Sequence, residues 1–266
     1  MEWIRGKLRA LRTLSTQARH FSNWKEVYAA FRRGQPLPTL QLRGGLTLEH
    51  GPSDDIWSLF HEIFVERCYA SPDFYVPQKE HCVLDCGANI GTFALYLQSV
   101  APGIRVHCFE PASDTRSRLE RNIGANHLEK YVTIHPFAVF DHEGELELPK
   151  ATFAGSASVF GEKTTGDAVE KVRCITLAEA LEQCKTSHVD LLKVDVEGAE
   201  LEILVNADSV SPPIWPKIQR VVMEYHEAIR PGCRQRIVKL LERHYAKVQS
   251  WPVTPAGELG IIQASR

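Results

Sequence analysis

The chain has 266 residues, of which 44% are hydrophobic and 24% are charged, a composition typical of a globular protein that can bury a sizeable core. Its 33 acidic and 31 basic side chains nearly cancel, so it lacks the basic excess that is usual in nucleic-acid-binding proteins. It also has no run of about 18 apolar residues and no recognisable secretory signal, so we expect neither a transmembrane span nor export.

Basic residues are concentrated at the start of the chain. The first 34 residues carry eight lysines and arginines against two glutamates, and apolar side chains recur there at roughly helical spacing. We predict that residues 1–34 are helical and pack on the rest of the protein, with weak contact to a membrane surface as the alternative. A short hairpin over residues 40–49, turning at Gly44 and Gly45, completes an N-terminal extension of residues 1–50.

Seven cysteines are scattered along the chain without the spacing of a disulfide framework. Such a pattern is typical of reduced thiols, which favours a cytoplasmic location. Cys82 and Cys86 have the spacing of half a metal site, but no second pair completes it, so we interpret them as strand residues.

Strand and helix patterns alternate from residue 81 onward, after a capped amphipathic helix expected over residues 56–68. This alternation predicts an α/β fold with a mostly parallel sheet, closed by two antiparallel strands. The expected strands cover residues 82–85, 105–110, 132–139, 189–194, 219–224, 247–250 and 259–263, and the expected helices cover residues 92–100, 114–125, 177–183, 200–206 and 232–244.

The first core strand runs into a glycine-containing loop. Gly87 and Gly91 allow a tight turn close to a bulky ligand, and Asn89 stands where a dinucleotide-binding loop would have its second glycine. Asp85 precedes the loop, where a carboxylate suits a cationic, amino-acid-bearing ligand better than a pyrophosphate. Because ligands of open α/β sheets lie beyond the carboxyl ends of the strands, we expect a ligand here.

Glu110 ends the second strand, nineteen residues after Gly91. A carboxylate at that place can accept hydrogen bonds from both ribose hydroxyls of a nucleoside. Together with the loop, it favours S-adenosylmethionine over a nicotinamide cofactor, which remains the rival interpretation.

Four segments resemble the FkbM family of methyltransferases: residues 83–91, residues 109–111 with Asn122 following, residues 190–200 and residues 222–226. The resemblance implies a Rossmann-like class I methyltransferase fold over residues 51–266, with a seven-stranded, mostly parallel sheet. It implies S-adenosylmethionine as cofactor and methylation of a hydroxyl on a small molecule, natural product or sugar. By position, Asp85, Gly87, Asn89 and Gly91 would line the cofactor, Glu110 would hold its ribose, and Ala138 would border its adenine.

Methylation of an alcohol needs a general base, and acids at the ends of the fourth and fifth strands are the candidates. Asp195 ends the fourth strand, where it would face the cofactor and orient or deprotonate the acceptor. Glu197 and Glu200 follow it, and either could instead help the N-terminus of the next helix. Glu224 and His226 alternate on one side of the fifth strand, so we expect His226 to act as the base and Glu224 to bind the acceptor hydroxyl.

A divalent metal is an alternative mechanism. Asp195, Glu224 and Glu197 could supply oxygen ligands to Mg²⁺, which would lower the pKa of a bound hydroxyl.

The residues 149–172, which are rich in small and polar side chains, are expected to form a lid or substrate loop. N- or C-methylation and a non-catalytic nucleoside-binding module remain the alternative functions.

Overall fold

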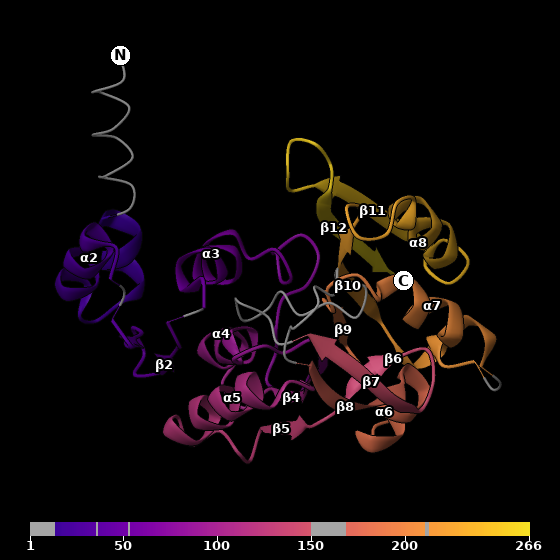
Figure 1. The fold of residues 1–266 in the computed structure, drawn as a ribbon, viewed down its shortest axis with the longest axis horizontal. Coiled ribbons are helices and arrows are strands. Elements are labelled where there is room, and N and C mark those ends of the chain that lie inside the picture. The colour runs from indigo at the N-terminus through magenta and orange to yellow at the C-terminus, as the bar shows by residue number, and fades with distance from the viewer. Residues whose placement is uncertain (1–13, 36, 53, 150–168, 211–212) are drawn as a thin grey trace.

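A seven-stranded sheet lies at the centre of the computed structural model, which describes all residues except 1–13, 36, 53, 150–168 and 211–212 (Figure 1). Five neighbouring strands are parallel, and two antiparallel strands complete one edge, as predicted. In spatial order the strands are β11 (Lys247–Pro252), β12 (Leu259–Ser265), β10 (Arg220–His226), β9 (Leu191–Val194), β3 (Cys82–Cys86), β4 (Arg105–Phe109) and β5 (Val132–His135).

Two apolar layers cover the two faces of this sheet. Neighbouring residues of one strand face opposite layers: Val83 belongs to the first layer and Leu84 to the second. The first layer holds α4 (Thr92–Val100) and α5 (Ser113–Ala125), and the second holds α6 (Leu177–Gln183), α7 (Glu200–Ser209) and α8 (Cys233–Leu241). Burial on both faces explains the nearly continuous apolar sequence of the parallel strands.

The direction of winding reverses between β3 and β9. From β3 the chain continues outward to β4 and β5 on one side, and later returns to form β9 and β10 on the other. Such a switch point leaves a crevice at the carboxyl ends of the strands, where α/β proteins bind ligands.

The predicted strand over residues 132–139 is wrong in its extent. The chain leaves the main sheet after His135, and β6 (Ala138–Phe140) pairs instead with β8 (Val169–Thr176), which also pairs with β7 (Gly144–Pro149). Pro136 follows the last residue of β5 and cannot donate a ladder hydrogen bond, which explains the break. The lid expected over residues 149–172 lies mostly outside the described residues.

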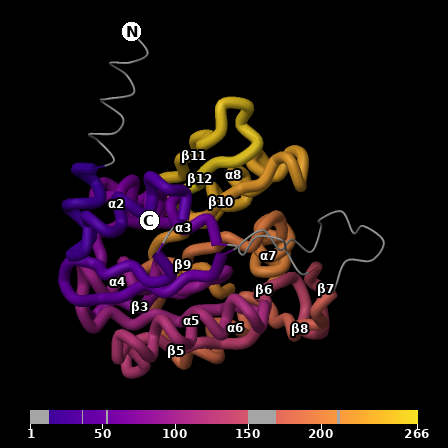
Figure 2. The backbone as a smooth tube through the Cα atoms, turned by 60° about the vertical axis from the view of Figure 1, so that its left-hand side comes forward, coloured from indigo at the N-terminus to yellow at the C-terminus, as the bar shows by residue number. Residues whose placement is uncertain are grey.

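The N-terminal segment packs on the same face as α4, where Phe21 and Leu40 share the apolar layer of Val83 (Figure 2). The expected continuous helix is interrupted: residues 14–20 are helical, the chain turns near Phe21, and α2 (Trp24–Arg33) follows, ending at Gly34 as predicted. The predicted hairpin is confirmed as β1 (Thr39–Gln41) and β2 (Thr47–Glu49).

The helix expected over residues 56–68 changes its winding half-way. A short helix, α3 (Ile56–Phe60), passes into one turn of wider π-helix, η1 (His61–Glu66), and Arg67 ends it in the left-handed region.

All seven cysteines are free thiols. Among the described residues, no helix has the length and apolar character that crossing a bilayer requires.

Candidate functional site

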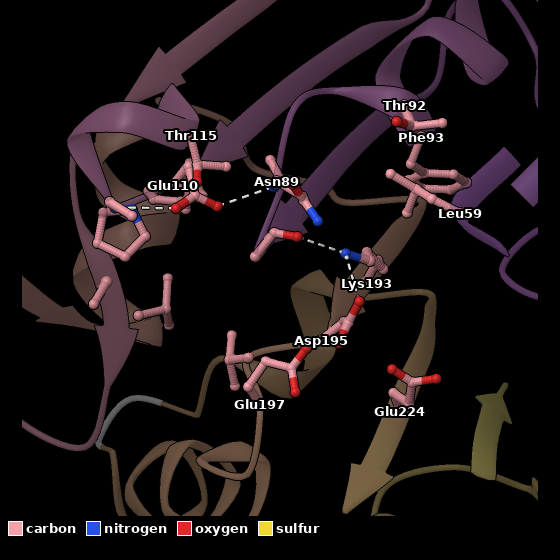
Figure 3. A pocket seen from close by; sticks show the side chains of 18 of the residues that line it. Leu59, Asn89, Thr92, Phe93, Glu110, Thr115, Lys193, Asp195, Glu197 and Glu224 are labelled. Atoms are coloured by element: carbon pink, nitrogen blue, oxygen red, sulfur yellow. Dashed lines mark hydrogen bonds and ion pairs between the residues drawn. The ribbon is translucent and has the colours of Figure 1, made fainter. Parts of the chain in front are cut away.

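A cavity of about 260 Å³ lies at the carboxyl ends of β3, β4, β9 and β10. The strand ends contribute Gly87, Asn89, Glu110, Asp195 and Glu224 to its lining, all of which the sequence singled out. Figure 3 shows Asn89 and Glu110 on one side of this cavity, with Asp195 and Glu224 across from them. We call it the strand-end cavity.

The loop after β3 fits against the end of β9. Gly87 has a φ of 80°, and a Cβ atom added to it would lie 1.7 Å from the carbonyl oxygen of Asp195. A side chain at this position would therefore push the two strand ends apart. Gly91 lies deeper, at the N-cap of α4, and is not among the residues that line the cavity.

Glu110 is held by backbone donors at the end of β4. The N–H of Asn89 donates to Oε2 at 2.9 Å, and the N–H of Ala112 donates to Oε1 at 3.0 Å. Burial raises the pKa of Glu110 to about 7, although the two hydrogen bonds favour the ionised form. The carboxylate therefore has a fixed orientation and a strong tendency to accept further hydrogen bonds.

Asp85 lies beneath the cavity rather than at its surface. It is fully buried, and the Nζ atom of Lys193 is 3.0 Å from its Oδ1 atom and donates to the carbonyl oxygen of Gly87 at 2.8 Å. Burial alone would lower the pKa of Lys193, but Asp85 and Asp195 outweigh it and raise that pKa above its ordinary value. Lys193 therefore stays charged and ties β9 to the loop.

Asp195 contacts both a hydroxyl and a cation through one carboxylate oxygen. Its Oδ2 atom accepts a hydrogen bond from the hydroxyl of Tyr69 at 3.1 Å and lies 3.4 Å from the Nζ atom of Lys193. Burial alone would raise the pKa of Asp195, but Lys193 and His226 outweigh it and lower that pKa. Asp195 is therefore ionised at neutral pH.

The pKa of Glu224 is shifted in the opposite direction from that of Asp195. Burial raises the pKa of Glu224 to about 10, with help from the carboxylates of Asp195 and Glu62. Glu62, which comes from η1, also lines the cavity, and burial together with Asp195 raises its pKa too. The cavity thus places an ionised acid beside two acids that favour the protonated form.

The comparisons with known proteins agree with this architecture. The family model described as "Methyltransferase FkbM domain" matches residues 85–245, which include every strand end of the cavity. The chain belongs to the FkbM methyltransferase family. The resemblance seen in the sequence is therefore confirmed.

Curated relatives include further methyltransferases. The chain is 28% identical to the 31-O-demethyl-FK506 methyltransferase FkbM of Streptomyces tacrolimicus, over 78% of this chain and 88% of the relative. It is 30% identical to the methyltransferase sdnD of Sordaria araneosa, over 69% of this chain and 79% of that relative. It is 27% identical to the AMB antimetabolite synthetase AmbE of Pseudomonas aeruginosa over 70% of this chain, but spans only 10% of that much longer protein.

A solved FkbM methyltransferase from Methylobacillus flagellatus has the same fold. It superposes with a TM-score of 0.53 and 15% identity, covering 98% of this chain and 60% of that one. The predicted Rossmann-like fold is confirmed. The chain again spans less than two thirds of this relative.

His226, the predicted base, contacts two glutamates. Its Nδ1 atom lies 2.9 Å from Oε1 of Glu200, and its Nε2 atom lies 3.3 Å from Oε2 of Glu197. Burial alone would lower the pKa of His226, but the hydrogen bonds to these glutamates outweigh it and raise the pKa to about 11. An imidazolium has no free lone pair, so this raised pKa argues against the predicted role of His226 as the base.

The two glutamates after Asp195 differ in their surroundings. Glu200 is buried and accepts a hydrogen bond from the N–H of Gly198 at 2.9 Å, so it stabilises the turn into α7, as expected. Glu197 has a φ of 56°, lines the cavity and contacts His226. Glu197 therefore belongs to the site as well as to the turn.

Three residues of the site were not predicted from the sequence. Tyr69 and Glu62 precede the first core strand in the sequence, so the rule that ligands lie at strand ends did not single them out. Lys193 of β9 stands two residues before Asp195, which directly follows the strand, and this alternation was the one available signal for it. Ala138 is placed as expected, because β6 brings it to the cavity wall.

Proposed function

We propose that this chain is an S-adenosylmethionine-dependent O-methyltransferase that acts on a hydroxyl of a small molecule. One observation carries the proposal: Glu110, held by the N–H groups of Asn89 and Ala112, faces Asp195 and Glu224 across one cavity. A nucleoside held at Glu110 would extend toward the acids that can bind an acceptor. The family membership supports the same activity, as does the relative from Streptomyces tacrolimicus, which is named for the O-methylation of a small molecule.

The residues present fit S-adenosylmethionine. The hydroxyl of Thr92 lies at the cavity and is buried without a hydrogen-bond partner among the described residues, so a polar ligand would satisfy it. The ionised carboxylate of Asp195 complements a ligand that carries both an ammonium and a sulfonium group. Ala138 and Val139 offer apolar contacts of the kind that an adenine ring needs.

When bound, S-adenosylmethionine supplies a methyl group that is already activated for transfer from sulfur. An acceptor hydroxyl that attacked this methyl group would have to give up its proton to a residue of the chain. Asp195 is the group we assign to receive the hydroxyl proton, because it is ionised and its neighbours fix its position.

Glu224 has a complementary part in this scheme. As a protonated acid it can donate a hydrogen bond to the acceptor oxygen and orient it toward the methyl group. Lys193 and Tyr69 hold Asp195 in place from two sides. His226 acts through Glu197 and Glu200 and does not itself exchange protons.

Calorimetric titration with S-adenosylhomocysteine tests the proposal. The wild type should bind it with one site per chain, and Glu110→Ala should weaken the affinity by about tenfold or more, since charged hydrogen bonds are lost. Glu129→Ala, which removes an exposed acid after α5, is the matched control and should bind as the wild type does. Wild-type protein that shows no affinity for this ligand would overturn the proposal.

A further inference from the structure

A second cavity, of about 580 Å³, adjoins the strand-end cavity. The two share the lining residues Ser58, Glu62 and Glu224. The acids that face the proposed methyl donor on one side therefore face the second cavity on the other. A molecule that occupied it would have one end at Glu224.

The walls of this second cavity are apolar and aromatic. Phe21, Phe31, Trp57 and Phe60 line it, and their rings pack on one another. The ring centroids of Phe31 and Trp57 lie 5.3 Å apart edge to face, and those of Phe21 and Phe60 lie 4.6 Å apart. Such walls bind the rings or alkyl groups of a ligand through burial of apolar surface.

Strand pairing joins this apolar wall to the acids. Glu224 of β10 is directly opposite Ile261 of β12, and side chains of directly opposed residues lie on the same face of a sheet. Ile261 and Leu259 line the second cavity together with Val253 from the connection before β12. The apolar lining therefore begins beside the carboxyl group of Glu224.

The second cavity offers an anion no lysine or arginine among its described lining residues. These residues include Glu62, Glu66 and Glu224. A phosphate or carboxylate on a ligand would lose its hydration there without gaining an ion pair with a lysine or arginine. This lining therefore disfavours anionic molecules.

We propose that the second cavity holds the body of the methyl acceptor, an uncharged molecule with a ring or alkyl skeleton whose hydroxyl reaches Glu224. This inference rests on the proposed function and adds the class of substrate to it. It also gives the N-terminal segment a part in the enzyme, because Phe21 and Phe31 of that segment form one wall. An acceptor hydroxyl at Glu224 would be next to Asp195.

Binding of the uncharged dye Nile red to the full chain, with S-adenosylhomocysteine at saturation, tests the inference without turnover. We expect saturable binding that Phe31→Asp and Val253→Asp each weaken by about tenfold, because a charge enters an apolar wall. Both side chains are more than a third exposed, so these variants should fold. Val205→Asp changes an equally exposed valine of α7 outside both cavities, and should leave dye binding unchanged.

The outcomes separate the inference from the proposed function. If the wild type does not bind S-adenosylhomocysteine, both are overturned. If it binds this ligand but does not bind the dye, or if neither aspartate variant weakens dye binding, the inference alone is overturned. Weakened dye binding together with unchanged S-adenosylhomocysteine affinity in the variants would support it.

Turnover supplies a second test. Pairs of aryl alcohols that differ only by an added carboxylate should be assayed by the release of S-adenosylhomocysteine. The uncharged member should have a kcat/KM at least about tenfold higher, since the carboxylate would be desolvated without a lysine or arginine to pair with. Equal or better turnover of the carboxylates would overturn the inference.

Discussion

The Nζ atom of Lys193 lies 3.0 Å from the Oδ1 atom of Asp85, and both side chains are almost completely buried. The pair joins β9 to β3 at the point where the sheet changes its direction of winding. Lys193 also reaches Asp195 and the carbonyl oxygen of Gly87, so one cation holds both the cofactor loop and the proposed base.

Replacement of Lys193 by methionine should lower the free energy of unfolding by about 3–5 kcal/mol, because Asp85 is left buried without a counter-charge. Urea unfolding measures this loss. The double variant Lys193→Met with Asp85→Leu should recover part of it, since no unpaired charge remains. Lys171→Met, at an exposed position of β8, is the control and should be close to neutral. If Lys193→Met lowers the free energy of unfolding no more than Lys171→Met does, the buried pair does not stabilise the fold.

Replacement of Gly87 by alanine should damage both stability and cofactor binding. The added Cβ would collide with the carbonyl oxygen of Asp195, and φ at this position is +80°, so we expect a loss of about 3–5 kcal/mol in the free energy of unfolding. Gly257→Ala is the matched control, because its φ is +75° and no atom lies within 4 Å of the added Cβ. It should cost only the backbone strain, about 1–2 kcal/mol, and leave S-adenosylhomocysteine binding intact. Equal effects of the two changes would contradict the close fit at Gly87.

The fold could be predicted because a parallel sheet buried on both faces needs apolar strands that alternate with helices, and this alternation is visible in the sequence. The carboxyl ends of parallel strands meet at one edge of the sheet, and this rule predicts that Glu110, Asp195 and Glu224 lie close together. The structure places all three at one cavity. The break after His135 was missed because the apolar pattern continues through Val139, although Pro136 marks the place.

Side-chain electrostatics could not be predicted in this way. His226 follows Glu224 at strand spacing, which suggested a neutral base, but Glu197 and Glu200 approach it from another element and hold it as a cation. Tyr69 reaches Asp195 across 126 residues of sequence. Contacts between segments so distant along the chain depend on tertiary packing, for which a single sequence carries no periodic signal.

The affinity for S-adenosylhomocysteine should depend on pH through Glu110. Its pKa is about 7 in the free protein, and ribose hydroxyls donate to the ionised form, so protonation below pH 7 should weaken binding. Between pH 8 and pH 6 the affinity should fall by about tenfold, as the ionised fraction does. Calorimetry across this range measures it, and Glu110→Gln should bind weakly with a flat profile. A wild-type profile equally flat would rule out Glu110 as the titrating contact.

Chelation of divalent metals should leave methyl transfer unchanged within about twofold, because the charges at the site already balance. Asp195, Glu197 and His226 each offer a ligand atom within 4.8 Å of the others, which is the arrangement of a metal site. Lys193 and protonated His226, however, already place two positive charges beside these carboxylates, and a third cation would be repelled. The measurement is activity after exhaustive dialysis against EDTA. Loss of activity that MgCl₂ restores would establish the metal mechanism instead.

The charge on His226 should appear as a pH-dependent contribution to stability. Its pKa of about 11 in the folded chain exceeds the ordinary value of 6.5, so its stabilising effect is complete below pH 6.5 and is lost as the pH rises through about 11. His226→Gln should therefore lower the free energy of unfolding by about 3–5 kcal/mol at pH 6, because Glu197 and Glu200 lose a buried counter-charge, and by less at pH 10.5. Urea unfolding at both values measures this difference, and His142→Gln, at an exposed position, should show neither effect. The pH profile of kcat/KM gives an independent readout, because a neutral histidine base would produce an acid limb near pH 6.5 that disappears in His226→Gln. Since His226 is already protonated there, we expect no limb that depends on it, whereas the acid limb near pH 7 that Glu110 produces through cofactor binding should persist in His226→Gln. A limb near pH 6.5 that His226→Gln removes would return His226 to the role of base.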